Sequence, residues 1–196
     1  MARRHAEMSD STRRQLLIEA TAAFGRHGYA DAPIEDLVRA AGLTRGALYH
    51  HFGSKQGLFE AVLRALDADI LLRIDAARRP GAAGLEDLLG ACRAYLQETL
   101  RPEVRRILLI DAPAVLGHDA SRALEVELGV RPLVAALESL KATGQISAAV
   151  DIPVLATLLN GLLNEAAFWI TEQPDPSQAL DRVMAQLMQL LTAIRG

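Results

Sequence analysis

The sequence of 196 residues is poor in cysteine and in aromatic residues. Its single cysteine, Cys92, excludes an intrachain disulfide and a cysteine-based metal cluster, and it is typical of a protein in a reducing cytosol. Aromatic residues make up only 4% of the chain, whereas 51% of it is hydrophobic. Most of that apolar content is leucine, alanine and valine, a mixture that favours helix. The composition therefore predicts a globular helical protein of one or two domains.

Motifs for catalysis and metal binding are also missing. The chain has no P-loop, no Gly-x-Ser-x-Gly and no Gly-x-Gly-x-x-Gly sequence. Its five histidines are His5, His27, His50, His51 and His118. None has the Glu-x-x-His or His-x-x-x-His spacing that would place two metal ligands on one helical face. We therefore predict no catalytic residue, no metal site and no cofactor, and a protein that is not an enzyme.

The N-terminus is charged, and no apolar run of a secretory signal follows it. Residues 152–170 form the one stretch that approaches the length of a membrane span. This stretch contains Asn160, Asn164 and Glu165, which would be costly in lipid. We therefore expect a buried helix in a soluble, cytoplasmic protein that has no membrane partner.

The net charge of −3 is unevenly distributed along the chain. Residues 1–64 contain nine basic and seven acidic residues, a net charge of +2. Residues 65–196 contain 12 basic and 17 acidic residues, a net charge of −5, and the two values together give −3. The basic excess lies in the N-terminal third, as a nucleic-acid-binding surface there would require. A mixed surface could also show this imbalance by chance.

Two short helices joined by a tight turn are predicted between residues 33 and 52. The first begins at Pro33, whose fixed φ suits a first helical position. Gly42 follows that helix as the residue that lets the chain turn left-handed, and Thr44 caps the second helix. This second helix runs from Arg45 to Phe52. Gly46 and Ala47 near its start are small enough to let its backbone approach base edges in a DNA groove. The pattern is typical of a helix-turn-helix motif.

The same stretch resembles the DNA-binding domain of the TetR family of bacterial transcription regulators. The matching residues, at the family's spacing, are Gly28-Tyr29, Ala41-Gly42-Leu43, Thr44-Arg45-Gly46-Ala47-Leu48-Tyr49-His50-His51-Phe52 and Ser54-Lys55. The resemblance covers residues 11–62, about a third of the chain. The family commonly has two hydroxyl residues before the first motif helix, where this chain has Ala32-Pro33. No phosphate contact is therefore carried over to that position.

The resemblance implies an all-α protein of about nine helices in two domains. Residues 1–55 would form an N-terminal three-helix helix-turn-helix domain with an N-terminal arm, and residues 56–196 a C-terminal helical domain for ligand binding and dimerisation. The sequence pattern predicts a mobile arm at 1–10, a first long helix at 11–27, a fourth helix at 55–78 and a break at 78–84. Further helices are expected at 85–100, 103–112, 119–143, 152–171 and 177–194, with a bend or short extension at 113–116 and a disturbance near Gly129 and Pro132.

By the family resemblance, Arg45 and Ala47 would lie nearest the base edges. An arginine can bind guanine O6 and N7 together, and an alanine methyl group can contact a thymine methyl group. Lys55 lies in a first helical turn, where the helix dipole disfavours a cation, so a nearby phosphate would explain it. The full set of predicted DNA-contacting residues is Thr44, Arg45, Gly46, Ala47, Tyr49, His50, His51, Lys55 and Arg13.

The last two predicted helices carry more apolar surface than one neighbour can cover. A gapless stripe runs from Leu180 to Ile194, and leucines of the preceding helix extend further round its surface. We therefore expect a homodimer through the last two helices, which the resemblance also implies, although a monomeric helical core would fit the pattern alone. Such a dimer would place two recognition helices about 34–36 Å apart on a near-palindromic operator.

Regulators that resemble this chain usually bind a small effector in the second domain. Polar groups set into apolar walls are typical of small-molecule pockets. The residues that we predict to line such a pocket are Cys92, Tyr95, Asp111, His118, Thr157, Asn160, Asn164 and Trp169. Each of them could instead cap a helix, bridge two helices or lie at the rim of the dimer.

The sequence thus predicts a sequence-specific DNA-binding transcriptional regulator, a repressor that an unknown small-molecule effector releases from double-stranded operator DNA. Two other classes stay open: a helical small-molecule-binding protein that does not bind DNA, and a helical enzyme. Binding to duplex DNA would separate the first of these from a regulator, and measured turnover would be needed to support the second.

Overall fold

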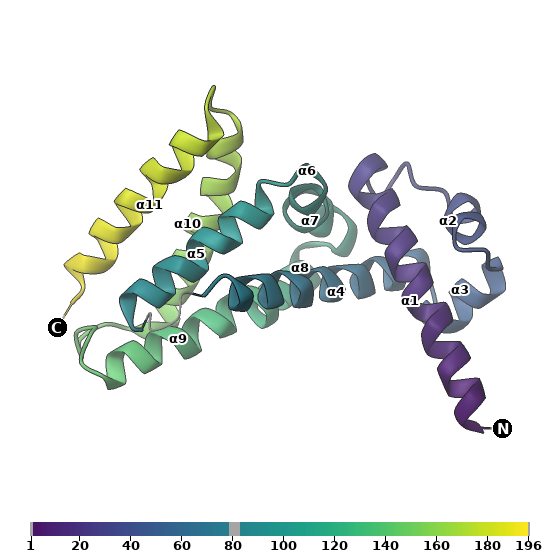
Figure 1. Cartoon of the computed structure of the whole chain (residues 1–196), viewed down its shortest axis with the longest axis horizontal. Helices are drawn as coiled ribbons and strands as arrows, with labels where there is room; N and C mark the ends of the chain where they lie inside the picture. The colour runs from purple at the N-terminus through teal and green to yellow at the C-terminus, as the bar shows by residue number, and fades with distance from the viewer. Residues whose placement is uncertain (1, 79–82, 196) are drawn as a thin grey trace. The chain divides into compact units, whose positions relative to one another are not determined.

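The computed structural model describes residues 2–78 and 83–195, and the side chains of all of these except residues 2–10. Within these ranges helix is the only regular secondary structure (Figure 1). The α-helices are α1 (Ala2–His27), α2 (Ile34–Ala40), α3 (Arg45–Phe52), α4 (Lys55–Ala76), α5 (Leu85–Thr99), α6 (Pro102–Arg105), α7 (Ala112–Leu116), α8 (His118–Glu125), α9 (Arg131–Ala142), α10 (Ile152–Thr171) and α11 (Pro176–Ala193). The predicted all-α class is confirmed.

Two π-helical turns, η1 (Arg106–Asp111) and η2 (Val126–Val130), join α6 to α7 and α8 to α9 without a break. The described residues therefore form nine continuous helical stretches. Each π turn lies just before a proline, Pro113 or Pro132. A proline lacks the N–H of an α-helical bond and its ring collides with the carbonyl four residues earlier, and a wider turn relieves both problems. The disturbance predicted near Pro132 is thus η2. Of the two alternatives predicted at 113–116, a bend or a short extension, the structure has the extension, helix α7.

The first helix differs most from its prediction. Helix α1 begins at Ala2, so the backbone of residues 2–10 is helical where a mobile arm was predicted. These residues contain neither proline nor glycine, and extending an existing helix requires no new nucleation. Of the break predicted at 78–84, residues 79–82 lie outside the described part of the chain.

Contacts divide the chain into two compact units, and the division falls within α4. The first unit includes the chain up to Ala68 together with Pro102–His118, and the second includes Asp69–Arg101 and the chain from Asp119 onward. The division predicted between residues 55 and 56 is one of function, and it stays a prediction.

The first unit is built around a cluster of three aromatic rings. The ring of Phe59 in α4 meets the rings of Phe24 and Tyr29 edge-on, at centroid distances of 5.3 and 5.2 Å. Phe24 and Phe59 are fully buried, and so is Leu48 of α3. Each edge-on contact adds about 0.5–1.5 kcal/mol to the stabilisation from burial. Three of the chain's few aromatic residues therefore join α1 to α4.

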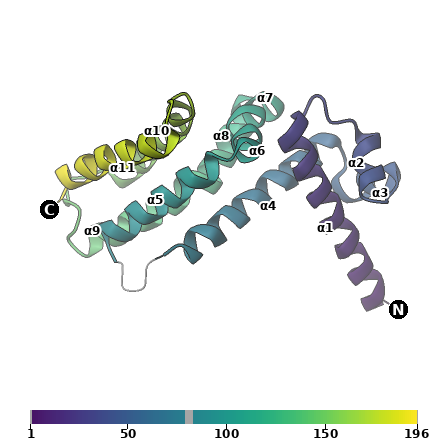
Figure 2. The same cartoon turned by 45° about the horizontal axis from the view of Figure 1, so that its top comes forward.

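The second unit packs α10 against α5, α9 and α11. Helices α10 and α11 lie side by side in both views (Figure 1, Figure 2). Among the described residues, α10 is the one helix that is long and apolar enough to cross a membrane, and 33% of its apolar window is buried. The expected buried helix is therefore covered on one side only. The exposed apolar residues of α10 are Val154, Leu158 and Leu162.

Close packing at the start of α4 leaves no room for a side chain at Gly57. A Cβ atom at Gly57 would overlap the backbone carbonyl oxygen of Phe52. We expect Gly57→Ala to lower the free energy of unfolding by about 1–3 kcal/mol, because a backbone atom cannot rotate away as a side chain can. Urea unfolding at fixed protein concentration measures the change.

The matched control is Gly90→Ala in the middle of α5. A Cβ atom at Gly90 would meet no atom of the described residues within 4 Å, apart from the local atoms of its own helix. This variant should be more stable than the original by up to about 1 kcal/mol, because alanine favours helix over glycine. Equal loss of stability in both variants would contradict the packing argument.

Candidate nucleic-acid interface

Helices α2 and α3 form the predicted helix-turn-helix. Gly42 has φ = 66°, and the backbone N–H of Leu43 donates to the carbonyl of Val38 at 2.8 Å, which closes the turn. Leu37, Val38 and Leu48 are buried and hold the two helices together. The left-handed turn predicted at Gly42 is confirmed.

The predicted start of α2 at Pro33 is wrong by one residue. Pro33 is the N-cap, with φ = −65° and ψ = 140°, and the helix begins at Ile34. An N-cap residue has an extended ψ, and this is compatible with the φ that proline fixes. Glu35 and Asp36 then occupy the first turn of α2, where the positive end of the helix dipole stabilises carboxylates.

The N-terminal turn of α3 is open to solvent. The hydroxyl of Thr44 accepts a hydrogen bond from the backbone N–H of Ala47 at 3.2 Å, which confirms the predicted cap. Gly46 is exposed, and within the described residues the nearest atom to a Cβ placed there is the Thr44 hydroxyl, at 3.8 Å. A larger residue would therefore fit in the isolated protein, so internal packing does not explain this glycine.

Arg45 leaves this turn on the outer surface and contacts two neighbours. Its Nη1 donates to the Glu35 carboxylate at 2.9 Å, and its Nη2 donates to the Tyr49 hydroxyl at 3.3 Å. The guanidinium also lies over the Tyr49 ring, 5.5 Å from its centroid. The hydrogen bond to Tyr49 and the charge of Glu35 both raise the pKa of Arg45, which stays protonated. The sequence interpretation missed Glu35, because no spacing along the chain joins it to Arg45.

The remaining predicted residues on α1 and α3 lie at the surface or near it. Tyr49 and His50 are exposed, whereas His51 is half-buried with its ring 5.3 Å from that of His50. Arg13 of α1 is exposed and lies over the ring of Phe52, 5.7 Å from its centroid. Phe52 itself is half-buried.

Lys55 has a tertiary partner that the sequence did not reveal. Its ammonium group lies 4.5 Å from the ring centroid of Tyr29, and it donates to the carbonyl of Ala30 at 3.4 Å. Burial lowers the pKa of Lys55, while the nearby carboxylates of Asp31 and Glu35 raise it. A cation in the first turn of α4 is therefore explained in part by these contacts, without a phosphate.

Two family models match this chain. Residues 16–62 match the model described as bacterial regulatory proteins of the tetR family. Residues 85–194, more than half of the chain, match the model of the tetracyclin repressor-like C-terminal domain. The chain belongs to the TetR family.

Solved structures agree with this assignment. A TetR-family transcriptional regulator from Pectobacterium atrosepticum is 39% identical, with a TM-score of 0.75 over 96% of both chains. A regulator from Rhodococcus sp. shares the fold at 21% identity, with a TM-score of 0.77 over 95% of this chain and 100% of that one.

Curated relatives match only part of this TetR-family chain. The transcriptional repressor AcnR of Corynebacterium glutamicum is 35% identical over 91 residues, which are 46% of this chain and 44% of AcnR. The regulator TtgR of Pseudomonas putida is 41% identical over 66 residues, 34% of this chain and 31% of TtgR. This chain therefore spans less than half the length of these two relatives.

In the second unit, three of the predicted pocket residues form one polar cluster. The hydroxyl of Tyr95 donates to Asn164 Oδ1 at 2.7 Å. Glu125 Oε1 accepts from Nδ2 of Asn160 at 2.7 Å and from Nδ2 of Asn164 at 3.3 Å. A Cβ atom at Gly129 would overlap Asn160 Oδ1, so a larger residue there would displace the Asn160 side chain. Glu125, which the sequence interpretation missed, joins the two asparagines of α10 to α8.

Three other predicted pocket residues of the second unit have different surroundings. Cys92 is buried, which raises the pKa of its thiol to about 12 and keeps it protonated at neutral pH. Thr157 donates to the carbonyl of Pro153 within its own helix at 2.9 Å, and Trp169 stacks under Arg182.

Asp111 and His118 belong to the first unit. Asp111 Oδ2 accepts the backbone N–H of Tyr29 at 2.8 Å, and His118 is exposed.

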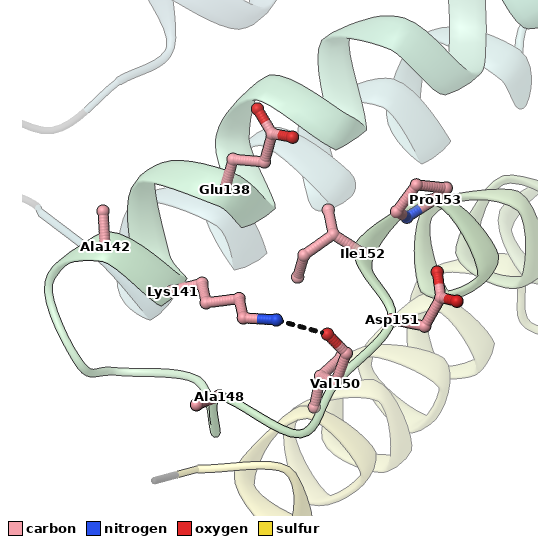
Figure 3. A pocket seen from close by; sticks show the side chains of 8 residues that line it. All are labelled: Glu138, Lys141, Ala142, Ala148, Val150, Asp151, Ile152 and Pro153. Carbon is pink, nitrogen blue, oxygen red and sulfur yellow. Dashed lines mark hydrogen bonds between the residues drawn. The ribbon is translucent and has the colours of Figure 1, made fainter.

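A shallow pocket of about 640 Å³ lies between α9 and the start of α10 (Figure 3). The Lys141 ammonium at its edge donates to the carbonyl of Val150 at 2.7 Å. Its lining residues are Glu138, Lys141, Ala142, Ala148, Val150, Asp151, Ile152 and Pro153. None of the predicted pocket residues is among them.

The polar cluster makes a prediction about stability. We expect Tyr95→Phe to lower the free energy of unfolding by about 0.5–1.5 kcal/mol, because it removes a hydrogen bond from a half-buried amide. Urea unfolding measures the change. Tyr49→Phe is the control, since the same hydroxyl is lost there at an exposed site and the stability should stay nearly constant. A Tyr95→Phe variant as stable as the original would exclude a stabilising role for the cluster.

Proposed function

We propose that this TetR-family protein is a sequence-specific DNA-binding transcriptional regulator. In this proposal, it represses transcription and a small-molecule effector releases it from its operator. The observation that carries the proposal is the open N-terminal turn of α3, where Gly46 is exposed although packing leaves room for a larger residue. Glycine destabilises a helix, and a glycine at such a position is explained when the helix backbone must approach another molecule closely. The curated relative AcnR is itself described as a repressor.

The chemistry of the surface around this turn suits duplex DNA. Arg45 and Ala47 lie in the first turn of α3 and would meet base edges in the major groove. Residues on either side would hold phosphates and fix the register of the complex. These phosphate-contacting residues are Thr44, Tyr49, His50, His51, Lys55 and Arg13. We assign DNA binding to residues 1–55, and ligand binding and dimerisation to residues 56–196.

The proposed regulator is a homodimer, and α10 supports this part of the proposal. One face of α10 is buried within the subunit, while Val154, Leu158 and Leu162 on the other side are exposed. They recur every four residues and therefore form an apolar stripe. A second copy of α10 and α11 would cover that stripe in a four-helix interface and place two α3 helices on one operator.

The effector site is placed in the second unit, near the polar cluster of Tyr95, Asn160 and Asn164. Polar groups among apolar helices would fix the orientation of a small molecule. The protein is proposed to be cytoplasmic and without enzymatic activity. A helical binding protein that ignores DNA is the alternative, and failure to bind any duplex would favour it.

Arg45 and Lys55 should affect DNA binding in different ways. Arg45→Ala is expected to weaken binding to the preferred duplex about 10- to 100-fold and to relax the preference at one base pair. Lys55→Ala should weaken binding to all duplexes about equally and reduce the slope of log affinity against log salt by about one. Fluorescence anisotropy with labelled duplexes at several salt concentrations measures both effects.

Circular dichroism must show that Lys55→Ala remains folded, because Lys55 also contacts Tyr29. If both variants bind the preferred duplex as tightly as the original protein, the assignment of α3 to the major groove is wrong.

The exposed stripe of α10 predicts the effect of a charge on assembly. Leu158 is 66% exposed in the subunit, so Leu158→Glu should leave the subunit folded. In a dimer it would bury an unpaired carboxylate and raise the dissociation constant at least about 30-fold. Sedimentation equilibrium measures the assembly. The control Leu72→Glu changes an equally exposed leucine of α4, 70% exposed, and should remain dimeric. If the Leu158→Glu variant still forms dimers, the dimer interface does not include this stripe of α10.

A further inference from the structure

Glu35 is an acidic residue on a surface that is proposed to bind a polyanion. It lies in the first turn of α2, and its side chain is 58% exposed. An exposed carboxylate near phosphates weakens binding to every DNA sequence. The helix dipole alone does not require it, because Asp36 already provides a carboxylate in the same turn. Its position therefore calls for a more specific explanation.

The contacts of Arg45 explain the position of Glu35. The guanidinium has five N–H donors, and Glu35 and Tyr49 each take one of them, from Nη1 and Nη2. Three donors remain, and guanine O6 and N7 need two. The two contacts thus hold the side chain without using up its capacity to bind a base.

Holding matters because arginine has many rotamers. An unrestrained arginine loses conformational freedom when it binds a base, and a restrained one loses less. A restrained arginine also adapts less readily to a phosphate or to a different base in the same groove. A carboxylate near the guanidinium therefore favours the base contact in two ways. It orders the arginine side chain, and it opposes contacts between the arginine and phosphates.

We propose that Glu35 positions Arg45 and thereby sets how sharply this protein discriminates between DNA sequences. The inference rests on the proposed function, because it assumes that Arg45 contacts a base. Glu35 is a positioning residue in this scheme and touches no base itself. Its carboxylate reduces affinity for all duplexes, and it increases the difference between the preferred sequence and the others.

The test uses duplexes that the original protein selects from a pool of random 30-base-pair sequences. Arg45→Ala identifies the base pair at which the preference relaxes. At that base pair, Glu35→Gln should reduce the preference about two- to fivefold, the range of an exposed ion pair. The same variant should bind unselected duplexes more tightly than the original protein does, because a negative charge has been removed.

The neighbouring ion pair provides a matched control. Asp36 and Arg39 meet at 2.9 Å, the same distance as Glu35 and Arg45, and both pairs are exposed. Asp36→Asn removes one negative charge from the same helical turn but leaves Arg45 held. It should change general affinity and stability much as Glu35→Gln does, and it should leave the base preference unchanged.

The double variant Glu35→Gln with Arg45→Ala completes the cycle. Glu35→Gln should not alter the preference further once Arg45 is absent. If Glu35→Gln keeps the full preference while Arg45→Ala loses it, the positioning role is wrong and the proposed function stands. If Asp36→Asn lowers the preference as much as Glu35→Gln, the effect belongs to the charge of α2 and not to the contact. If the original protein selects no sequence from the pool, the proposed function fails and the inference fails with it.

Discussion

The edge-on contacts of Phe59 with Phe24 and Tyr29 join α4 to α1 and to the residues just after it, and the helix-turn-helix is arranged on that frame. Helix α2 packs on α1, and α3 packs on α2. Because this frame supplies the buried surface, α3 contributes only Leu48 as a fully buried side chain. The rest of α3 can face outward without loss of the core. The exposure of α3 is therefore a consequence of how the other helices are held.

Charged groups on this surface are held by neighbours before any partner binds. Arg45 contacts Glu35 and Tyr49, and Lys55 contacts Tyr29 and the carbonyl of Ala30. A side chain that is already ordered loses less entropy in a complex. Tyr29 thus has two functions, since the ring that packs on Phe59 also holds Lys55. Under the proposed function, stability and DNA binding therefore share residues at Tyr29.

In the second unit the polar residues are engaged with each other. Glu125 joins Asn160 and Asn164 just before the π-helical turn η2, and Gly129 within that turn leaves space for the Asn160 side chain. π-helical turns frequently occur at functional sites. An effector that binds at this cluster would have to replace hydrogen bonds that already exist, and it would act on a turn that is already wider than an α-helix.

Local patterns in the sequence determined the helices, their caps and the family. Gly42, Thr44 and the apolar spacing act over a few residues, so their effects can be predicted from the chain alone. The tertiary structure decided which polar residues meet. Glu35 and Arg45 are ten positions apart and Asn160 and Glu125 are 35 apart, and no local rule relates residues at such separations. The extension of α1 to Ala2 was also missed, because residues 2–10 contain neither proline nor glycine and so nothing in them ends the helix. Hydrogen bonds between distant residues depend on how helices pack, and packing is a property of the whole fold.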